Sequence, residues 1–199
     1  MKKIPICLII VRLFLGLLIV LLSILKVEHY EIIAIAGLYI GLLTDIFDGI
    51  IARKLNVSTQ SLRRLDSTID LVFFISISVA TYLQCASFFK ENASKLIILF
   101  AAEGFTYVIC FFKFKKEIAT HTLGAKIWTL TLVCCLTEII LQCSSTYLFN
   151  ICFWLGIATR LEIIGIILVL KKWVNDVPSI FHAIKLRNGL QIKRNKLFN

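Results

Sequence analysis

Four of the five aspartates in the chain lie between Asp45 and Asp70, in two pairs. Asp45 and Asp48 are three residues apart, and Asp66 and Asp70 are four apart, so on a helix each pair points to one face. Both pairs stand at the ends of long apolar runs, where an unpaired carboxylate is costly. Because converging carboxylates repel each other unless cations lie between them, the pattern predicts a divalent-metal site at a membrane surface. The alternative is two solvated helix ends with ordinary acidic side chains.

The composition excludes an ordinary soluble domain. The chain has 199 residues, 59% of them hydrophobic, and a mean hydropathy of +0.89. Apolar runs of about 20 residues recur, which is the length a helix needs to cross a bilayer. The first run contains Arg12 and is followed by no small-residue cleavage site, so we expect a retained helix and not a signal peptide.

These runs predict an all-α, multi-pass membrane protein with six transmembrane helices and a short amphipathic cytoplasmic helix. We expect a transmembrane domain over residues 1–173 and a basic cytoplasmic tail over residues 174–199. In the tail, Ile180, Phe181 and Ile184 would form an apolar face on the inner leaflet. The expected spans are approximately 4–25, 31–52, 66–89, 94–112, 122–142 and 150–172.

The net charge of +10 reports topology more than a nucleic-acid partner, which we do not expect. With six spans, one side of the membrane holds most of the basic residues, and the positive-inside rule makes that side cytoplasmic. Both termini and the aspartates then face the cytoplasm, in the plasma (inner) membrane. The cytoplasmic set is Lys2, Lys3, Lys54, Arg63, Arg64, Lys113, Lys115, Lys116 and the tail; the outer set is Lys26, Lys90 and Lys95.

Three further features bear on packing. Arg12 lies two turns into the first span, so its guanidinium either reaches the cytoplasmic interface or faces a polar interior. Gly37 and Gly41 give the second span a small-residue face for close helix packing. The seven cysteines show no metal-type spacing and are expected to be reduced, with a Cys143–Cys152 disulfide near the outer face as the alternative.

The aspartate stretch resembles the signature of the CDP-alcohol phosphotransferase (CDP-alcohol phosphatidyltransferase) family, D-x2-D-G-x2-A-R-x8-G-x3-D-x3-D. The opening IPICLIIVR also resembles the first helix of the family, and segment 123–129 is similar to one in members that make phosphatidylglycerol phosphate, through Lys126 and Thr129. The overall plan is closest to those phosphatidylglycerol phosphate synthase-like members. Seven of the eight signature positions match: Asp45, Asp48, Gly49, Ala52, Arg53, Asp66 and Asp70.

The resemblance implies a metal-dependent transferase that moves a phosphoalcohol group from a CDP-alcohol to an acceptor hydroxyl and releases CMP. It assigns two Mg²⁺ or Mn²⁺ ions to Asp45, Asp48 and Asp66, and makes Asp70 the base, which also touches a metal. It also implies a homodimer in the lipid bilayer. The donor would be bound at Gly49, Ala52, Arg53 and the position of Leu62, with Arg53 holding either a phosphate or an aspartate.

Leu62 departs from the signature, which has glycine there. A leucine would narrow the cytidine pocket, change the nucleotide preference or weaken activity, and the last of these motivates a non-catalytic relative as an alternative. A cation transporter that uses intramembrane Asp and Glu is another, although the aspartates cluster at one face instead of spacing through the bilayer.

For the acceptor, the Lys126 segment and the chain length favour CDP-diacylglycerol as donor and glycerol 3-phosphate as acceptor. Lys126 and Arg160 are the candidates for gripping the acceptor phosphate, and the lysines at 113, 115 and 116 have positive-inside charge as a simpler explanation. Arg160 and Glu162 are two residues apart and cannot face each other on a regular helix, so structural pairing with Glu138 or Arg12 on another span competes with substrate contact, and Glu103 has the same two interpretations. Inositol phosphate, serine or phosphatidylglycerol as acceptor, or a CDP-aminoalcohol donor, remain alternatives within the family.

Overall fold

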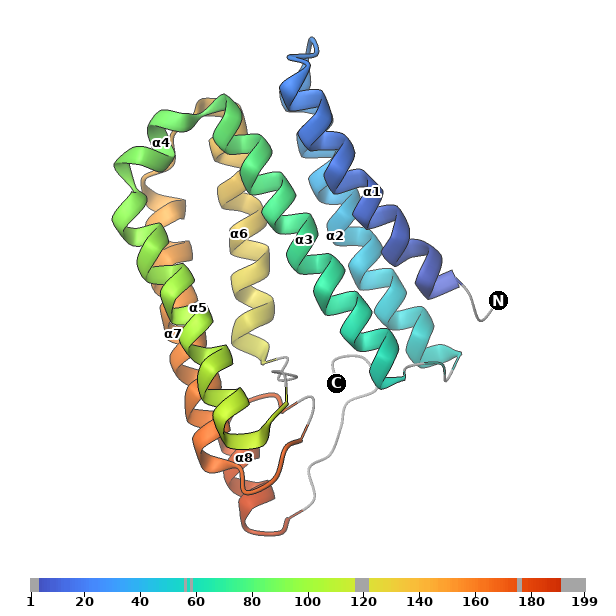
Figure 1. Ribbon diagram of the computed structural model, residues 1–199, viewed down its shortest axis with the longest axis vertical. Helices are drawn as coiled ribbons and strands as arrows, with labels where there is room; N and C mark the ends of the chain where they lie inside the picture. The colour runs from blue at the N-terminus through green and yellow to red at the C-terminus, as the bar shows by residue number, and fades with distance from the viewer. Residues whose placement is uncertain (1–3, 56, 58, 117–121, 175–176, 191–199) are drawn as a thin grey trace. The chain divides into compact units, whose positions relative to one another are not determined.

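The computed structural model describes residues 4–55, 57, 59–116, 122–174 and 177–190. Within these ranges the chain is helical and contains no strand, and six of its helices are long and apolar enough to cross a membrane. The predicted all-α class with six spans is confirmed (Figure 1). The spanning helices are α1 (Ile4–Ile24), α2 (Tyr30–Lys54), α3 (Gln60–Gln84), α5 (Ala93–Phe114), α6 (Leu123–Gln142) and α7 (Tyr147–Val169), and the short helices are α4 (Ala86–Glu91) and α8 (Ile180–Arg187).

The third span begins earlier than the sequence predicts. We expected it to start near Asp66, but α3 starts at Gln60 because the Thr59 hydroxyl caps it by accepting a hydrogen bond from the Leu62 N–H at 3.2 Å. Residues 60–65, which are polar except for two leucines, therefore extend the helix instead of forming a loop. Asp66 and Asp70 lie in its second and third turns, and Leu62 lies in its first. The span also ends earlier, at Gln84, and the unpredicted helix α4 follows.

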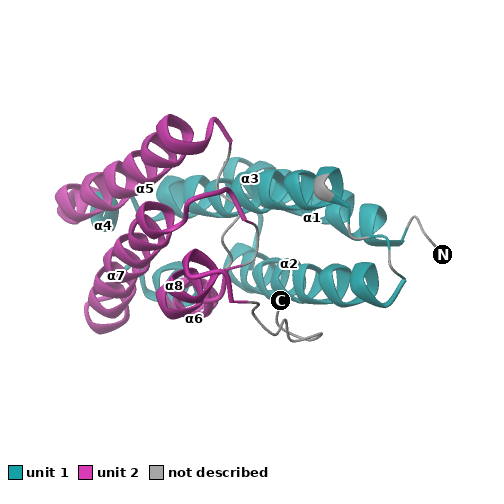
Figure 2. Cartoon of the chain, turned by 90° about the horizontal axis from the view of Figure 1, so that it is seen from below, with its two compact units in different colours: residues 1–89, 136–144 teal, residues 90–135, 145–199 magenta. Residues whose placement is uncertain are grey.

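The chain divides into two compact units, which Figure 2 shows in different colours. The first unit comprises residues 1–89 and 136–144, and the second comprises residues 90–135 and 145–199. The four aspartates and Arg12 belong to the first unit, whereas Lys126 and Arg160 belong to the second. The domain boundary predicted at residue 173 falls inside the second unit and stays a prediction.

In the first unit, α1 packs along both α2 and α3 (Figure 1). The small-residue face predicted on α2 is used for this packing. A Cβ on Gly37 would come within 2.5 Å of Ile19 Cδ1, and one on Gly41 would overlap the ring of Phe73 on α3. Glycine at these positions therefore lets the three helices approach closely enough for their polar side chains to meet.

The end of the first unit opposite the aspartates is held by polar contacts and by a disulfide. The Ser23 hydroxyl donates to the Ala80 carbonyl at 3.0 Å, and Gln84 Nε2 donates to the Ser23 carbonyl at 2.9 Å. Cys85 forms a disulfide with Cys143, so the expectation of reduced cysteines is wrong for these two residues. Cys152 is a buried free thiol, so the Cys143–Cys152 alternative is also wrong. The pairing of Cys85 with Cys143 was not predicted because the two residues are 58 positions apart and no spacing pattern links them.

The second unit contains α5, most of α6, α7 and α8. α7 packs against α5 and α8, and Ile166 and Leu170 form a buried cluster with Val177 and Ala183 beside α8. Phe181 of α8 is 72% exposed, and Ile184 on the same short helix is also exposed. Ile180, which was predicted to share this face, instead packs against the buried cluster of its own unit, so the exposed apolar surface of the helix comprises Phe181 and Ile184.

Candidate active site

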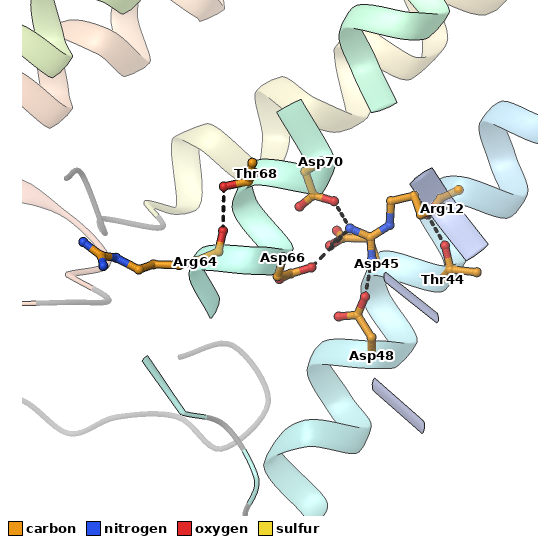
Figure 3. Close-up of polar contacts among 9 residues, drawn as sticks. Arg12, Thr44, Asp45, Asp48, Arg64, Asp66, Thr68 and Asp70 are labelled. Atoms are coloured by element: carbon orange, nitrogen blue, oxygen red, sulfur yellow. Dashed lines mark hydrogen bonds and ion pairs between the residues drawn. The ribbon is translucent and has the colours of Figure 1, made fainter. Parts of the chain in front are cut away.

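Four aspartates from two helices converge in the first unit (Figure 3). Asp45 and Asp48 lie in the last turns of α2, and Asp66 and Asp70 lie near the start of α3. The side chain of Asp48 is 4% exposed, whereas those of the other three are between 27% and 38% exposed. The group therefore has one buried wall and one side that reaches the surface of the unit.

Arg12 of α1 lies among all four carboxylates (Figure 3). Its Nη1 is 3.2 Å from Asp45 Oδ1 and 3.2 Å from Asp66 Oδ1. The same nitrogen pairs with Asp70 Oδ1, and Nη2 pairs with Asp48 Oδ2. The side chain is only 1% exposed, so of the two interpretations of Arg12 the polar interior is the one observed.

The position of Arg12 follows from the buried stripe of α1. The residues of this stripe are three or four apart, so they lie on one face of the helix. Sequence reasoning did not find this face because α1 is apolar all round, and hydropathy alone cannot distinguish its buried side. The signal was the set of small and polar residues on the stripe, which a lipid-facing surface does not favour: Arg12, Gly16 and Ser23, beside Pro5, Ile9 and Ile19.

Among the five side chains of this group, the carboxylates outnumber the single guanidinium. With its carboxylates ionised, four negative charges face one guanidinium, and neighbouring carboxylates at these separations repel each other by a few kcal/mol per pair even with substantial screening. The donor oxygens of Asp45, Asp48 and Asp66 lie within 4.8 Å of one another. Carboxylate oxygens are the ligands that Mg²⁺ and Mn²⁺ prefer, so this donor set fits a divalent cation.

The donor-binding candidates lie beside the aspartates on the same two helices. Arg53 folds back along α2, and a Cβ on Gly49 would be 3.7 Å from its Nη1 and Nη2. Ala52 is buried, and its carbonyl accepts a hydrogen bond from the Val57 N–H at 3.0 Å. Leu62 has helical backbone geometry, so the glycine of the family signature is not required here for its conformation.

The two acceptor-phosphate candidates lie in the second unit. Arg160 pairs with Glu103 of α5, and its Cζ lies 4.7 Å from the centre of the Trp128 ring. The structural pairing expected to compete with substrate contact thus exists, but its partner is Glu103 and not Glu138. Lys126 lies in the first turn of α6, where the Thr122 hydroxyl accepts a hydrogen bond from the Ala125 N–H.

Comparison with known proteins identifies the whole transmembrane region. The family model for CDP-alcohol phosphatidyltransferase matches residues 2–170, which includes α1 to α7 and all of the residues that surround the aspartates. No curated protein and no solved structure matched the chain. A family match over this much of the chain, together with four converging aspartates, shows that the chain belongs to the CDP-alcohol phosphatidyltransferase family.

Proposed function

We propose that this protein transfers the phosphatidyl group of CDP-diacylglycerol to a hydroxyl of glycerol 3-phosphate and releases CMP, as a step in phospholipid synthesis. Family membership supplies the class of reaction, a CDP-alcohol donor and an alcohol acceptor. The observation that carries the proposal is the convergence of Asp45, Asp48, Asp66 and Asp70 around a buried cationic side chain. Lys126 and Thr129, within the segment that resembles phosphatidylglycerol phosphate synthases, support the choice of acceptor.

The aspartates would divide between two tasks. Asp45, Asp48 and Asp66, whose oxygens lie within 4.8 Å of one another, would hold two Mg²⁺ or Mn²⁺ ions, with Asp70 beside them. Cations bound there would neutralise the donor pyrophosphate and make the acceptor hydroxyl more acidic. A free aspartate has a pKa of about 3.9 and is a weak base at neutral pH. Asp70 can therefore accept the hydroxyl proton only where that acidity is raised, which requires it to adjoin the metal ligands.

The bond changes follow from these positions. The acceptor oxygen attacks the phosphorus that carries diacylglycerol and forms a new P–O bond, while its proton passes to a carboxylate oxygen of Asp70. The P–O bond to the bridging oxygen breaks, and CMP leaves with that oxygen. Arg53, folded along Gly49, would bind a donor phosphate, and the missing Cβ of Gly49 leaves its backbone accessible to the donor.

The disulfide supports a cytoplasmic active site. Cys85 directly follows α3, and Asp70 lies 15 residues earlier on that helix, so about 22 Å of helix separates them. That separation is most of the roughly 30 Å thickness of a bilayer core, which supports locations toward opposite sides of the membrane. Because disulfides persist in oxidising compartments, the bridge supports an outward-facing Cys85–Cys143 end and cytoplasmic aspartates, and the positive-inside distribution supports the same orientation. We propose the plasma membrane as the location.

The test is CMP release from labelled CDP-diacylglycerol by membranes that contain the full-length protein, with Mg²⁺ or Mn²⁺ and a panel of acceptors. We expect metal-dependent release with glycerol 3-phosphate and none with Asp66→Asn. Glu28→Gln, which removes an exposed carboxylate outside the site, should retain activity. No metal-dependent release with any donor or acceptor would contradict the proposal and favour the non-catalytic relative.

Release with inositol phosphate, serine or phosphatidylglycerol, or from a CDP-aminoalcohol, would keep the reaction class and replace the substrate. The family resemblance also supports a homodimer, which cross-linking in membranes would test. An ion flux in reconstituted vesicles, abolished by the same aspartate substitutions, would instead favour the cation transporter.

A further inference from the structure

We propose that Arg12 is a built-in counter-ion of the metal site: it holds the four aspartates together in the metal-free protein and competes with divalent cations for them. The inference rests on the proposed metal use of this site and concerns the state before the metal binds. It assigns to α1, which carries no metal ligand in the proposed function, control over the affinity of the site for its cofactor.

The geometry of Arg12 is that of a central cation. Three of the four aspartates, Asp45, Asp66 and Asp70, approach the single nitrogen Nη1, and Asp48 approaches Nη2. An Nη nitrogen has only two hydrogens to donate, so three carboxylates at one nitrogen exceed what directed hydrogen bonding can satisfy. The carboxylates are gathered around a point of positive charge, which is also how they would surround a metal ion.

Burial makes this arrangement consequential for the apo protein. The side chain of Arg12 is 1% exposed and that of Asp48 is 4% exposed, so neither charge is solvated by bulk water. Without Arg12, the metal-free site would contain four mutually repelling carboxylates on two helices. The packing of α1 along both α2 and α3 brings this cation to the point where the two aspartate pairs meet.

The same contacts oppose metal binding. A divalent cation needs the carboxylate oxygens that Arg12 now engages, and the fixed positive charge of Arg12 repels it. Binding therefore requires the guanidinium to give up at least some of its four partners. The cost of that exchange would keep the affinity of the site below what the four carboxylates alone would provide.

The test uses full-length protein in detergent and Arg12→Met, which keeps a long side chain and removes the charge. Mn²⁺ affinity is measured from the electron paramagnetic resonance signal of free Mn²⁺, and thermal unfolding is measured in EDTA and with saturating Mn²⁺. We expect the Mn²⁺ dissociation constant of Arg12→Met to fall about tenfold or more. We also expect its unfolding temperature to fall in EDTA and to recover when Mn²⁺ is added.

An unchanged or weaker Mn²⁺ affinity in Arg12→Met, or a loss of thermal stability that Mn²⁺ does not reverse, would overturn the inference and leave Arg12 a structural ion-pair residue. If Arg12→Met does not fold, Arg12→Lys replaces it. Lysine keeps the positive charge, but its single compact ammonium group cannot contact all four carboxylates at once. We therefore expect Arg12→Lys to bind Mn²⁺ more tightly than wild type. Equal Mn²⁺ affinity of the two proteins would overturn the proposal.

Two controls separate this inference from the proposed function. Lys26→Gln removes one exposed positive charge about 21 Å along the chain from Arg12, beyond the far end of α1, and should leave Mn²⁺ affinity unchanged. Asp48→Asn should weaken Mn²⁺ binding. If wild type binds no more Mn²⁺ than Asp48→Asn does, the proposal of a metal site at the aspartates is wrong. If wild type binds Mn²⁺ and Arg12→Met binds it equally, only the role of Arg12 fails.

Discussion

Gly41 of α2 lies directly against the ring of Phe73 on α3, one turn before Asp45. A Cβ at Gly41 would overlap ring carbons of Phe73, so these two helices cannot keep their spacing if position 41 carries any side chain. The spacing matters for the proposed function because α2 and α3 each carry one of the aspartate pairs. The close approach of Gly41 and Phe73 thus sets the distance across which the carboxylates face each other.

Gly41→Ala should lower both stability and turnover. Overpacking at a close helix contact costs about 1–3 kcal/mol in the free energy of unfolding, and the shift it forces would move Asp45 relative to α3. Thermal unfolding and CMP release would measure the two effects. Adding Phe73→Leu should recover part of both. Gly104→Ala is the matched control, because a Cβ at Gly104 meets nothing within 4 Å. Equal effects of the two alanines would show that the Gly41 contact is unimportant.

Substitutions of Asp70 and Asp48 should impair the reaction in different ways. Asp70→Asn removes the proposed base and should lower turnover by about 10²–10⁴-fold while Mn²⁺ binding persists. Asp48→Asn, at the buried wall of the site, should weaken Mn²⁺ binding, with turnover partly restored at high Mn²⁺. Titration of both variants with Mn²⁺, followed by CMP release, distinguishes the two outcomes. If excess Mn²⁺ restored Asp70→Asn, Asp70 would be a metal ligand and not the base.

A feature of the fold or of the site could be predicted only where it produces a recognisable pattern in the sequence. Span number follows from run length, and the pairing of Asp45 with Asp48 and of Asp66 with Asp70 follows from helical spacing. The contact of Arg12 with all four was not predicted, because α1 is apolar on every side and its buried stripe has no hydropathy contrast. The early start of α3 was missed because most of residues 60–65 are polar, although Thr59 supplies the cap.

Leu62→Gly should leave donor turnover unchanged or raise it. Leu62 lies in the first turn of α3 with helical backbone geometry, so the backbone does not require glycine there, and the remaining reason for glycine is space for the proposed donor nucleotide. We expect Leu62→Gly to have a lower KM for CDP-diacylglycerol than wild type and to lose up to about 1 kcal/mol in helix stability. Leu62→Ala shortens the side chain with less backbone cost and controls for that loss. Complete inactivity of both variants would mean that the leucine itself contacts the donor.

Reduction of the Cys85–Cys143 disulfide should destabilise the first unit without removing any site residue. The bridge joins positions 58 residues apart, and such cross-links contribute about 2–4 kcal/mol to the free energy of unfolding. Cys85→Ser should therefore unfold at a lower temperature than wild type, whereas Cys134→Ser, which alters an exposed free thiol, should not. A maleimide that cannot cross membranes should label Cys143 in intact cells only in the Cys85→Ser variant. Labelling only after permeabilisation would reverse the proposed topology.

The ion pair between Arg160 and Glu103 allows the structural role of Arg160 to be separated from acceptor binding. Glu103→Gln leaves the Arg160 charge without its partner and should lower the free energy of unfolding by about 1–3 kcal/mol, since Glu103 is partly exposed. Combining it with Arg160→Gln removes both charges and should recover stability. If Arg160 also grips the acceptor phosphate, the double variant will still show a KM for glycerol 3-phosphate raised about tenfold or more, equivalent to the loss of one charge-assisted hydrogen bond. A double variant with wild-type stability and wild-type KM would assign Arg160 to the ion pair alone and leave Lys126 as the remaining candidate for the acceptor phosphate.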